Sequence, residues 1–160
     1  MNWLRWWWPA LLWAALVTSF STDAFSAEHT SRIIIPLIRW LFPHAAPATL
    51  AFVHHLIRKA AHVSEYFILS LLLLRGIRGT QGGWRVGWAV EAVAVAAGWA
   101  ALDELHQAFV PSRGPSMRDV LIDVTGALAA QLVYAAVALI RTRPSSAAPN
   151  APIDGSNLRV

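Results

Sequence analysis

Long apolar stretches alternate with short polar or turn-forming stretches along this chain. A helix needs about 20 mostly apolar residues to cross roughly 30 Å of hydrocarbon. Four stretches reach or approach this length, so the pattern predicts an all-α membrane fold in which four transmembrane helices form a bundle. The predicted spans cover about residues 6–22, 56–75, 84–103 and 119–140.

A shorter apolar stretch, from Ile33 to Pro43, lies between the first two predicted spans. Because it is short and interrupted by prolines, it predicts a helix that lies in the membrane interface or packs across the mouth of the bundle. Residues 144–160 are rich in Pro, Ser, Ala and Asn, which predicts a disordered tail. Residues 1–143 are expected to form one transmembrane domain.

The N-terminal apolar stretch has two interpretations. Arg5, the apolar run and the small residues around Ala24 imitate a cleaved signal peptide. The stretch is long for the central region of a signal, however, and it is crowded with tryptophan, which is enriched where lipid meets water. We therefore favour a resident first span that is anchored by Trp3, Trp6, Trp7 and Trp8.

The overall composition is that of a membrane protein. Hydrophobic residues make up 56% of the chain and charged residues only 14%, whereas soluble domains carry about 25% charged residues. The chain has no cysteine, which excludes disulfides, thiolate nucleophiles and cysteine-ligated metals. The basic residues are scattered at the ends of the predicted spans and form no phosphate-binding stripe, so nucleic acid is not an expected partner.

The basic residues also predict an orientation. The loop between the second and third spans carries Arg75, Arg78 and Arg85 without an acidic residue, and Arg141 follows the fourth span. Positively charged loops favour the cytoplasmic side, so the protein is expected in the plasma (inner) membrane with both termini in the cytoplasm. Six cations lie on the opposite side, and either the orientation is reversed or they partner acidic groups there. They are Arg32, Arg39, Arg58, Lys59, Arg113 and Arg118.

Six of the nine acidic residues lie within or at the ends of the predicted spans, where they must face inward or into water. They are Glu65, Glu91, Asp103, Glu104, Asp119 and Asp123. Helical spacing puts Lys59, His62 and Tyr66 on one face of the second span, with Glu65 beside them. On the fourth span the same spacing aligns the two aspartates with Gly126 and Ala130, a small-residue pair that lets another helix approach.

Bundling would gather these polar groups at one rim, because the second span starts, the third ends and the fourth starts on the same membrane face. The sequence therefore predicts an outward-facing polar pocket. Its expected residues are Lys59, His62, Glu65, Tyr66, Asp103, Glu104, Gln107, Arg113, Asp119 and Asp123.

The order of these residues resembles the signature of the VanZ-like family, over roughly Leu56 to Leu139. The matching residues are Lys59-x-x-His62-x-x-Glu65-Tyr66, then Asp103-Glu104-x-x-Gln107-x-Phe109-x-Pro111-x-Arg113-x-x-Ser116-x-x-Asp119, and then Gly126. The family comprises small bacterial integral membrane proteins named after one associated with low-level resistance to teicoplanin. In many relatives the residues before this glycine resemble an Asp-xxx-Asn pattern, whereas this chain has Asp123 in place of the asparagine. A role for that position therefore carries over less surely.

The resemblance implies a protein of the cell envelope but no reaction, so three hypotheses remain. In the first, the pocket binds a lipid head group or a cell-wall precursor through Arg113 and Lys59, with Asp103, Glu104 and Asp119 ordering these cations, and glycopeptide susceptibility changes indirectly. In the second, the same residues act as an acid/base or metal-assisted enzyme on a lipid-linked substrate. In the third, the polar groups only lock the helices together.

No cofactor is evident from the sequence. A divalent metal near His62, Asp103, Glu104 and His106 is possible, although no HExxH, Walker or glycine-rich phosphate-binding pattern is present. The simpler alternatives are ion pairs: Asp103 and Glu104 with Arg113 or Lys59, and Arg113 with Asp119.

Overall fold

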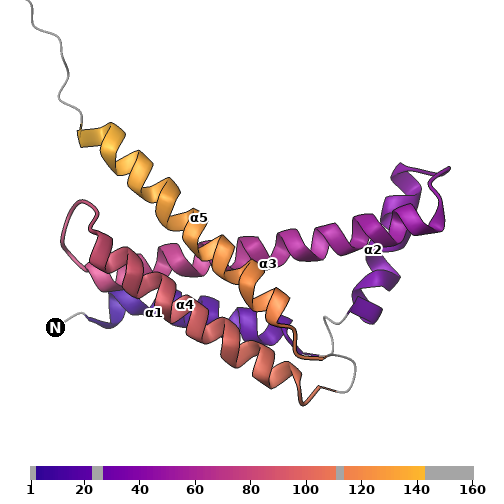
Figure 1. Ribbon diagram of the computed structural model, residues 1–160, viewed down its shortest axis with the longest axis horizontal. Helices are drawn as coiled ribbons and strands as arrows, with labels where there is room; N and C mark the ends of the chain where they lie inside the picture. The colour runs from indigo at the N-terminus through magenta and orange to yellow at the C-terminus, as the bar shows by residue number, and fades with distance from the viewer. Residues whose placement is uncertain (1–2, 23–26, 111–113, 143–160) are drawn as a thin grey trace, which may run out of the picture.

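The apolar segments fold as helices throughout the part of the chain that the computed structural model describes, residues 3–22, 27–110 and 114–142. No strand occurs in those residues, so the all-α prediction is confirmed (Figure 1). The helices are α1 (Leu4–Phe20), α2 (Ala27–Leu41), α3 (Pro47–Arg78), α4 (Val86–Gln107) and α5 (Met117–Thr142). The predicted tail, residues 144–160, lies outside the described residues.

Three of the helices, α3, α4 and α5, are long and apolar enough to cross a membrane. The first helix, α1, has 17 residues, which at 1.5 Å per residue extend over about 26 Å. It is thus slightly shorter than the hydrocarbon layer of roughly 30 Å. Three of the four predicted spans are therefore helices of membrane-crossing length and composition.

The short helix α2 occupies the position of the proline-interrupted apolar stretch, with Pro36 inside it. It stands beside the N-terminal part of α3, at the right of Figure 1. Thr30 Oγ1 and His54 Nε2 lie 3.3 Å apart and connect the two helices. The α3 helix itself begins at Pro47, because proline suits the first helical position. It therefore starts well before Leu56, where the predicted span begins.

The bundle is organised around α3, which packs against each of the other four helices. Small side chains allow these close contacts: Ala92, Ala96 and Ala100 of α4 recur at every fourth position and are fully buried. The α5 helix approaches α3 closely, and a Cβ placed on Gly126 would meet the backbone of Val63. The predicted small-residue face of α5 thus lies against α3.

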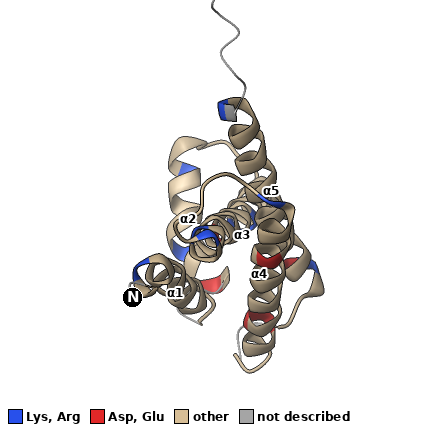
Figure 2. Cartoon of the chain, turned by 90° about the vertical axis from the view of Figure 1, so that its left-hand side faces the viewer, with Lys and Arg blue, Asp and Glu red and all other residues tan. Residues whose placement is uncertain are grey.

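Arginines gather at one end of the bundle, whereas cations and acidic groups meet at the other end. The start of α1, the end of α3 and the start of α4 lie together at the left of Figure 1, and α5 also ends on this side, above them. Figure 2 views the molecule from this end and shows Lys and Arg segments on α1, α3 and α5. The end of α4 and the start of α5 lie at the other end (Figure 1), and this is where the acidic groups of the predicted pocket come together.

Candidate functional site

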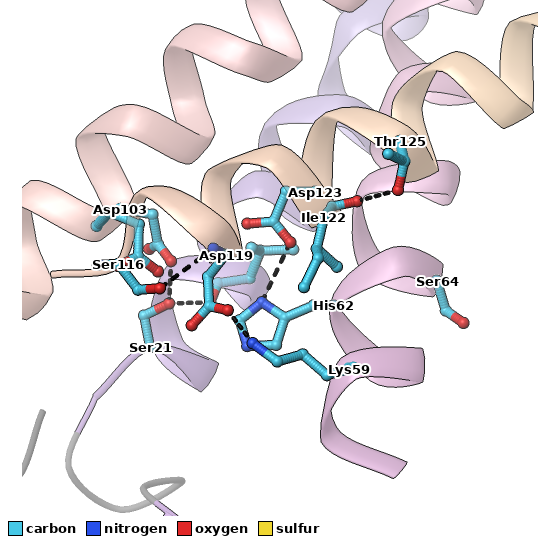
Figure 3. A network of polar contacts seen from close by, with 12 residues as sticks. Ser21, Lys59, His62, Ser64, Asp103, Ser116, Asp119, Ile122, Asp123 and Thr125 are labelled. Carbon is cyan, nitrogen blue, oxygen red and sulfur yellow. Dashed lines mark hydrogen bonds and ion pairs between the residues drawn. The ribbon is translucent and has the colours of Figure 1, made fainter. Parts of the chain in front are cut away.

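Four helices contribute polar side chains to one cluster, which Figure 3 shows from close by. The cluster lies between the middle of α3, the end of α1, the end of α4 and the start of α5. Nine of the ten predicted pocket residues belong to described parts of these helices. The tenth, Arg113, lies outside the described residues.

Two ion pairs join α3 to α5. Lys59 Nζ contacts Asp119 Oδ1, and both side chains are partly exposed. One turn further along both helices, His62 Nδ1 lies 3.2 Å from Asp123 Oδ1. The Asp123 side chain is only 1% exposed, so His62 is the polar partner that compensates for its burial. The helical spacing of these four residues therefore produces two parallel cross-links.

The end of α4 is tied to the end of α1 through Asp103. Its Oδ2 accepts hydrogen bonds from the hydroxyl of Ser21 and, at 3.2 Å, from the amide of Gln107. Gln107 therefore orients the carboxylate of Asp103. Sequence analysis did not identify Ser21, whose only signal is that it is a polar residue at the end of an apolar helix. The pairing expected for Asp103, with Arg113 or Lys59, is absent for Lys59, which contacts Asp119 instead.

Glu104 binds the start of α5. Its Oε2 accepts a 2.6 Å hydrogen bond from the backbone N–H of Ser116, and the Ser116 hydroxyl accepts one from the N–H of Asp119. The first N–H groups of a helix have no partners inside the helix, and the helix dipole favours negative charge there. Glu104 thus fixes the position of α5 relative to α4.

Three oxygens of this cluster are buried without a hydrogen-bond partner in the described parts of the chain. They are the hydroxyl of Tyr66, Oδ1 of Asp103 and Oε1 of Glu104. The residues are 1%, 5% and 4% exposed, respectively. Buried polar atoms are nearly always hydrogen-bonded in folded proteins, so each exception calls for an explanation such as a functional role. The structural role of each carboxylate therefore uses only one of its two oxygens.

Two neighbouring cavities open beside the cluster. The polar cavity, of about 370 Å³, is lined by Ala27, Ala51, His54, His55, Arg58, Lys59, His62 and Asp119. The apolar cavity, of about 240 Å³, is lined by Phe20, Ser21, Thr30, Ile34, Ile57, Arg58, Ala61, His62 and Glu65. Arg58 and His62 line both cavities, so a charged surface borders a mostly hydrocarbon one.

Arg58 is a cation of this end whose guanidinium is not held by a carboxylate in the described residues. It is half-buried on α3, and its guanidinium makes no hydrogen bond or ion pair with any described residue. Its neighbour Lys59, in contrast, is held by Asp119. The sequence analysis counted Arg58 among the cations on this side of the membrane but not among the pocket residues. The direction of its side chain depends on how α3 is rotated in the bundle, which the sequence does not give.

Other predicted groups are placed apart from the cluster or bind different partners. Glu91 is exposed on α4, 12 residues before Asp103 and hence about 18 Å away along the helix. Among the residues that the structure describes, no group of three or more His, Asp or Glu side chains could hold a metal ion. His62 is engaged with Asp123, and His106 is exposed on α4.

The polar cluster and the helices that build it fall within one region of family similarity. No curated protein and no solved structure matches the chain. The VanZ/LLP1 family matches it over residues 6–140, a range that includes α2, α3 and α4 completely and nearly all of α1 and α5. This match covers most of the 160 residues, and the chain therefore belongs to the VanZ/LLP1 family.

Proposed function

We propose that this VanZ-like protein crosses the bacterial plasma membrane four times and binds the anionic head group of a lipid or lipid-linked cell-wall precursor at its outer face. In this proposal α1 crosses the membrane together with α3, α4 and α5, and α2 lies in the interface. The cluster of Arg75, Arg78 and Arg85 supports a cytoplasmic position for the opposite end and for both termini. The two cavities at the cluster then face outward.

Arg58 is the observation that carries this proposal. A half-buried guanidinium without a hydrogen bond to a described residue keeps its N–H donors for a ligand, and its planar fork matches the oxygens of a phosphate or carboxylate. Lys59 and three histidines line the same polar cavity. The carboxylate of Asp119 is already paired with Lys59, so it holds that lysine in place in the wall of the polar cavity.

The neighbouring apolar cavity supports an amphiphilic ligand. Phe20, Ile34 and Ile57 give it a hydrocarbon wall, while Arg58 and His62 form the border with the polar cavity. Binding sites commonly combine apolar walls with a few polar groups that fix orientation. The head group would bind at Arg58 and the first part of its hydrocarbon chain would lie against the apolar wall. An effect on teicoplanin susceptibility would follow indirectly, through altered envelope composition.

Replacing Arg58 by glutamine should weaken the binding of a short-chain phosphatidylglycerol about tenfold, because a charge-assisted pair of hydrogen bonds is lost. Titration of the purified protein in a zwitterionic detergent, followed by native mass spectrometry, measures the change. The matched control is Arg39→Gln, which removes an exposed arginine of α2 that does not line either cavity. Equal affinities for Arg58→Gln and the wild type would contradict the proposal.

A second candidate function, acid/base catalysis on a lipid-linked substrate, is favoured by the unpartnered oxygens of Asp103 and Glu104. Asp103 also lines a small cavity of about 170 Å³ with Thr18, Trp99, Leu102 and His106. A carboxyl group that keeps one oxygen uncommitted while the other is hydrogen-bonded is oriented in a way that suits proton transfer.

The amide variants Asp103→Asn and Glu104→Gln distinguish the two candidates. A catalyst should lose at least about a hundredfold in turnover in one of these variants, whereas a binding protein should keep its affinity within a few-fold. Mass spectrometry of a lipid-linked cell-wall precursor incubated with purified protein measures turnover. If the wild-type protein leaves the precursor unchanged, or if both variants turn it over normally, the catalytic candidate is wrong.

A further inference from the structure

A further cavity lies at the opposite, arginine-rich end of the bundle, where α3 and α5 end. It has a volume of about 230 Å³ and is lined by Arg78, Gly83, Tyr134, Val137, Ala138 and Arg141. Two of these six residues are arginines and none is acidic. The wall therefore combines two positive charges with the small apolar side chains of α5.

Arg78 is held in one orientation by its surroundings. Its Nη1 donates hydrogen bonds to the hydroxyl of Tyr134 and, at 3.4 Å, to the carbonyl of Gly83. The guanidinium carbon lies 5.6 Å from the centre of the Tyr134 ring. Nε is buried and has no partner in the described residues. The contacts thus use one corner of the guanidinium and leave Nη2 without an acceptor in the described residues.

The other arginines of this end are used within the protein. Arg75 donates to the backbone carbonyls of Trp6 and Arg5, both at 3.2 Å, and its guanidinium lies over the Trp6 ring. Arg85 lies 4.6 Å from the ring centre of Trp88. Arg141, in contrast, is exposed and makes no hydrogen bond or ion pair with a described residue. Arg78 and Arg141 thus share one cavity and keep guanidinium N–H donors without an acceptor in the described residues.

We propose that this cavity binds a phosphate group, carried either by an anionic lipid of the adjoining leaflet or by a soluble phosphate compound. The ends of α3 and α5 each contribute a partial charge of roughly −0.5, which opposes an anion. Each arginine contributes a full positive charge, so the site stays positive overall. Val137 and Ala138 beside the arginines provide an apolar surface on which the glycerol and first methylenes of a lipid can lie.

Titration of the purified protein with phosphatidylglycerol and with diacylglycerol, which lacks the phosphate, tests this proposal by native mass spectrometry. Wild-type protein should prefer phosphatidylglycerol, and Arg78→Gln and Arg141→Gln should each weaken its binding about tenfold. Tyr134→Phe should weaken it less, because only the orientation of Arg78 is disturbed. The matched control is Arg85→Gln, which removes an arginine of the same end that lies outside the cavity and should leave the binding unchanged.

Two additions complete the test. Competition by inorganic phosphate would identify a soluble ligand, and resistance to it would identify the lipid; either result supports a phosphate site if it requires Arg78. Arg58→Gln should retain the Arg78-dependent binding, which separates this cavity from the one at the other end.

Because Arg141 is exposed, its variant should fold even if Arg78→Gln does not. Wild-type affinity in a folded Arg141→Gln variant, or equal affinity for the two lipids in the wild type, would overturn the proposal.

Discussion

The Gly126→Ala variant is expected to unfold at a clearly lower temperature in detergent than the wild-type protein. A Cβ on residue 126 would come within 3.1 Å of the backbone carbon atoms of Val63 and closer still to its carbonyl oxygen. Backbone atoms cannot rotate away as a side chain can, so α5 would have to separate from α3. Overpacking of this kind costs about 3 kcal/mol, and it occurs in the interface that holds Lys59 and His62 against α5.

Gly98→Ala is the matched control for this prediction. Gly98 lies inside α4, and a Cβ there would meet nothing within 4 Å. Because alanine favours the helix over glycine by up to about 1 kcal/mol, the control should be neutral or slightly stabilising. Thermal unfolding followed by circular dichroism, with gel filtration to detect aggregation, compares the two variants. Equal unfolding temperatures would mean that α3 and α5 are not in close backbone contact at Gly126.

His62→Leu is expected to destabilise the protein by about 3–5 kcal/mol, the usual effect of removing one partner from a buried charged pair. The variant leaves the carboxylate of Asp123, which is 1% exposed, without its hydrogen-bond partner on α3. Asp123→Asn should cost less than about 1 kcal/mol, because the amide keeps an oxygen that can accept from His62 Nδ1.

Unfolding of these variants in increasing sodium dodecyl sulfate, monitored by circular dichroism, gives the required comparison. The double variant His62→Leu/Asp123→Leu should recover most of the lost stability, because both polar groups are then replaced by apolar ones. This recovery separates the effect of an unpaired carboxylate from a simple loss of packing. A His62→Leu variant as stable as Asp123→Asn would show that the pair does not hold α3 and α5 together.

Much of this arrangement follows from helical periodicity alone. Lys59 and His62 on α3, and Asp119 and Asp123 on α5, lie on single faces because one turn separates the members of each pair. The sequence therefore predicts that all four residues meet at one rim. It does not predict that Lys59 pairs with Asp119 and not with Asp103, because the choice depends on the rotation and crossing point of two helices.

Other features depend on contacts between distant segments and carry little sequence signal. Ser21 reaches Asp103 only because the end of α1 packs near the end of α4. In the sequence Arg58 is a cation next to Lys59 without a further signal. It lines two cavities because α2 lies beside α3. The early start of α3 at Pro47 shows that a helix can extend beyond the apolar stretch from which its span is predicted.

The α3 helix is longer than the hydrocarbon layer of a bilayer is thick. Its 32 residues measure about 48 Å at 1.5 Å per residue, whereas the hydrocarbon layer is roughly 30 Å thick. Arg58 and Arg78 are 20 residues apart on this helix, or about 30 Å. When α3 stands upright and Arg78 lies at one boundary of the hydrocarbon layer, Arg58 lies near the other boundary, and the turns from Pro47 onward extend beyond it.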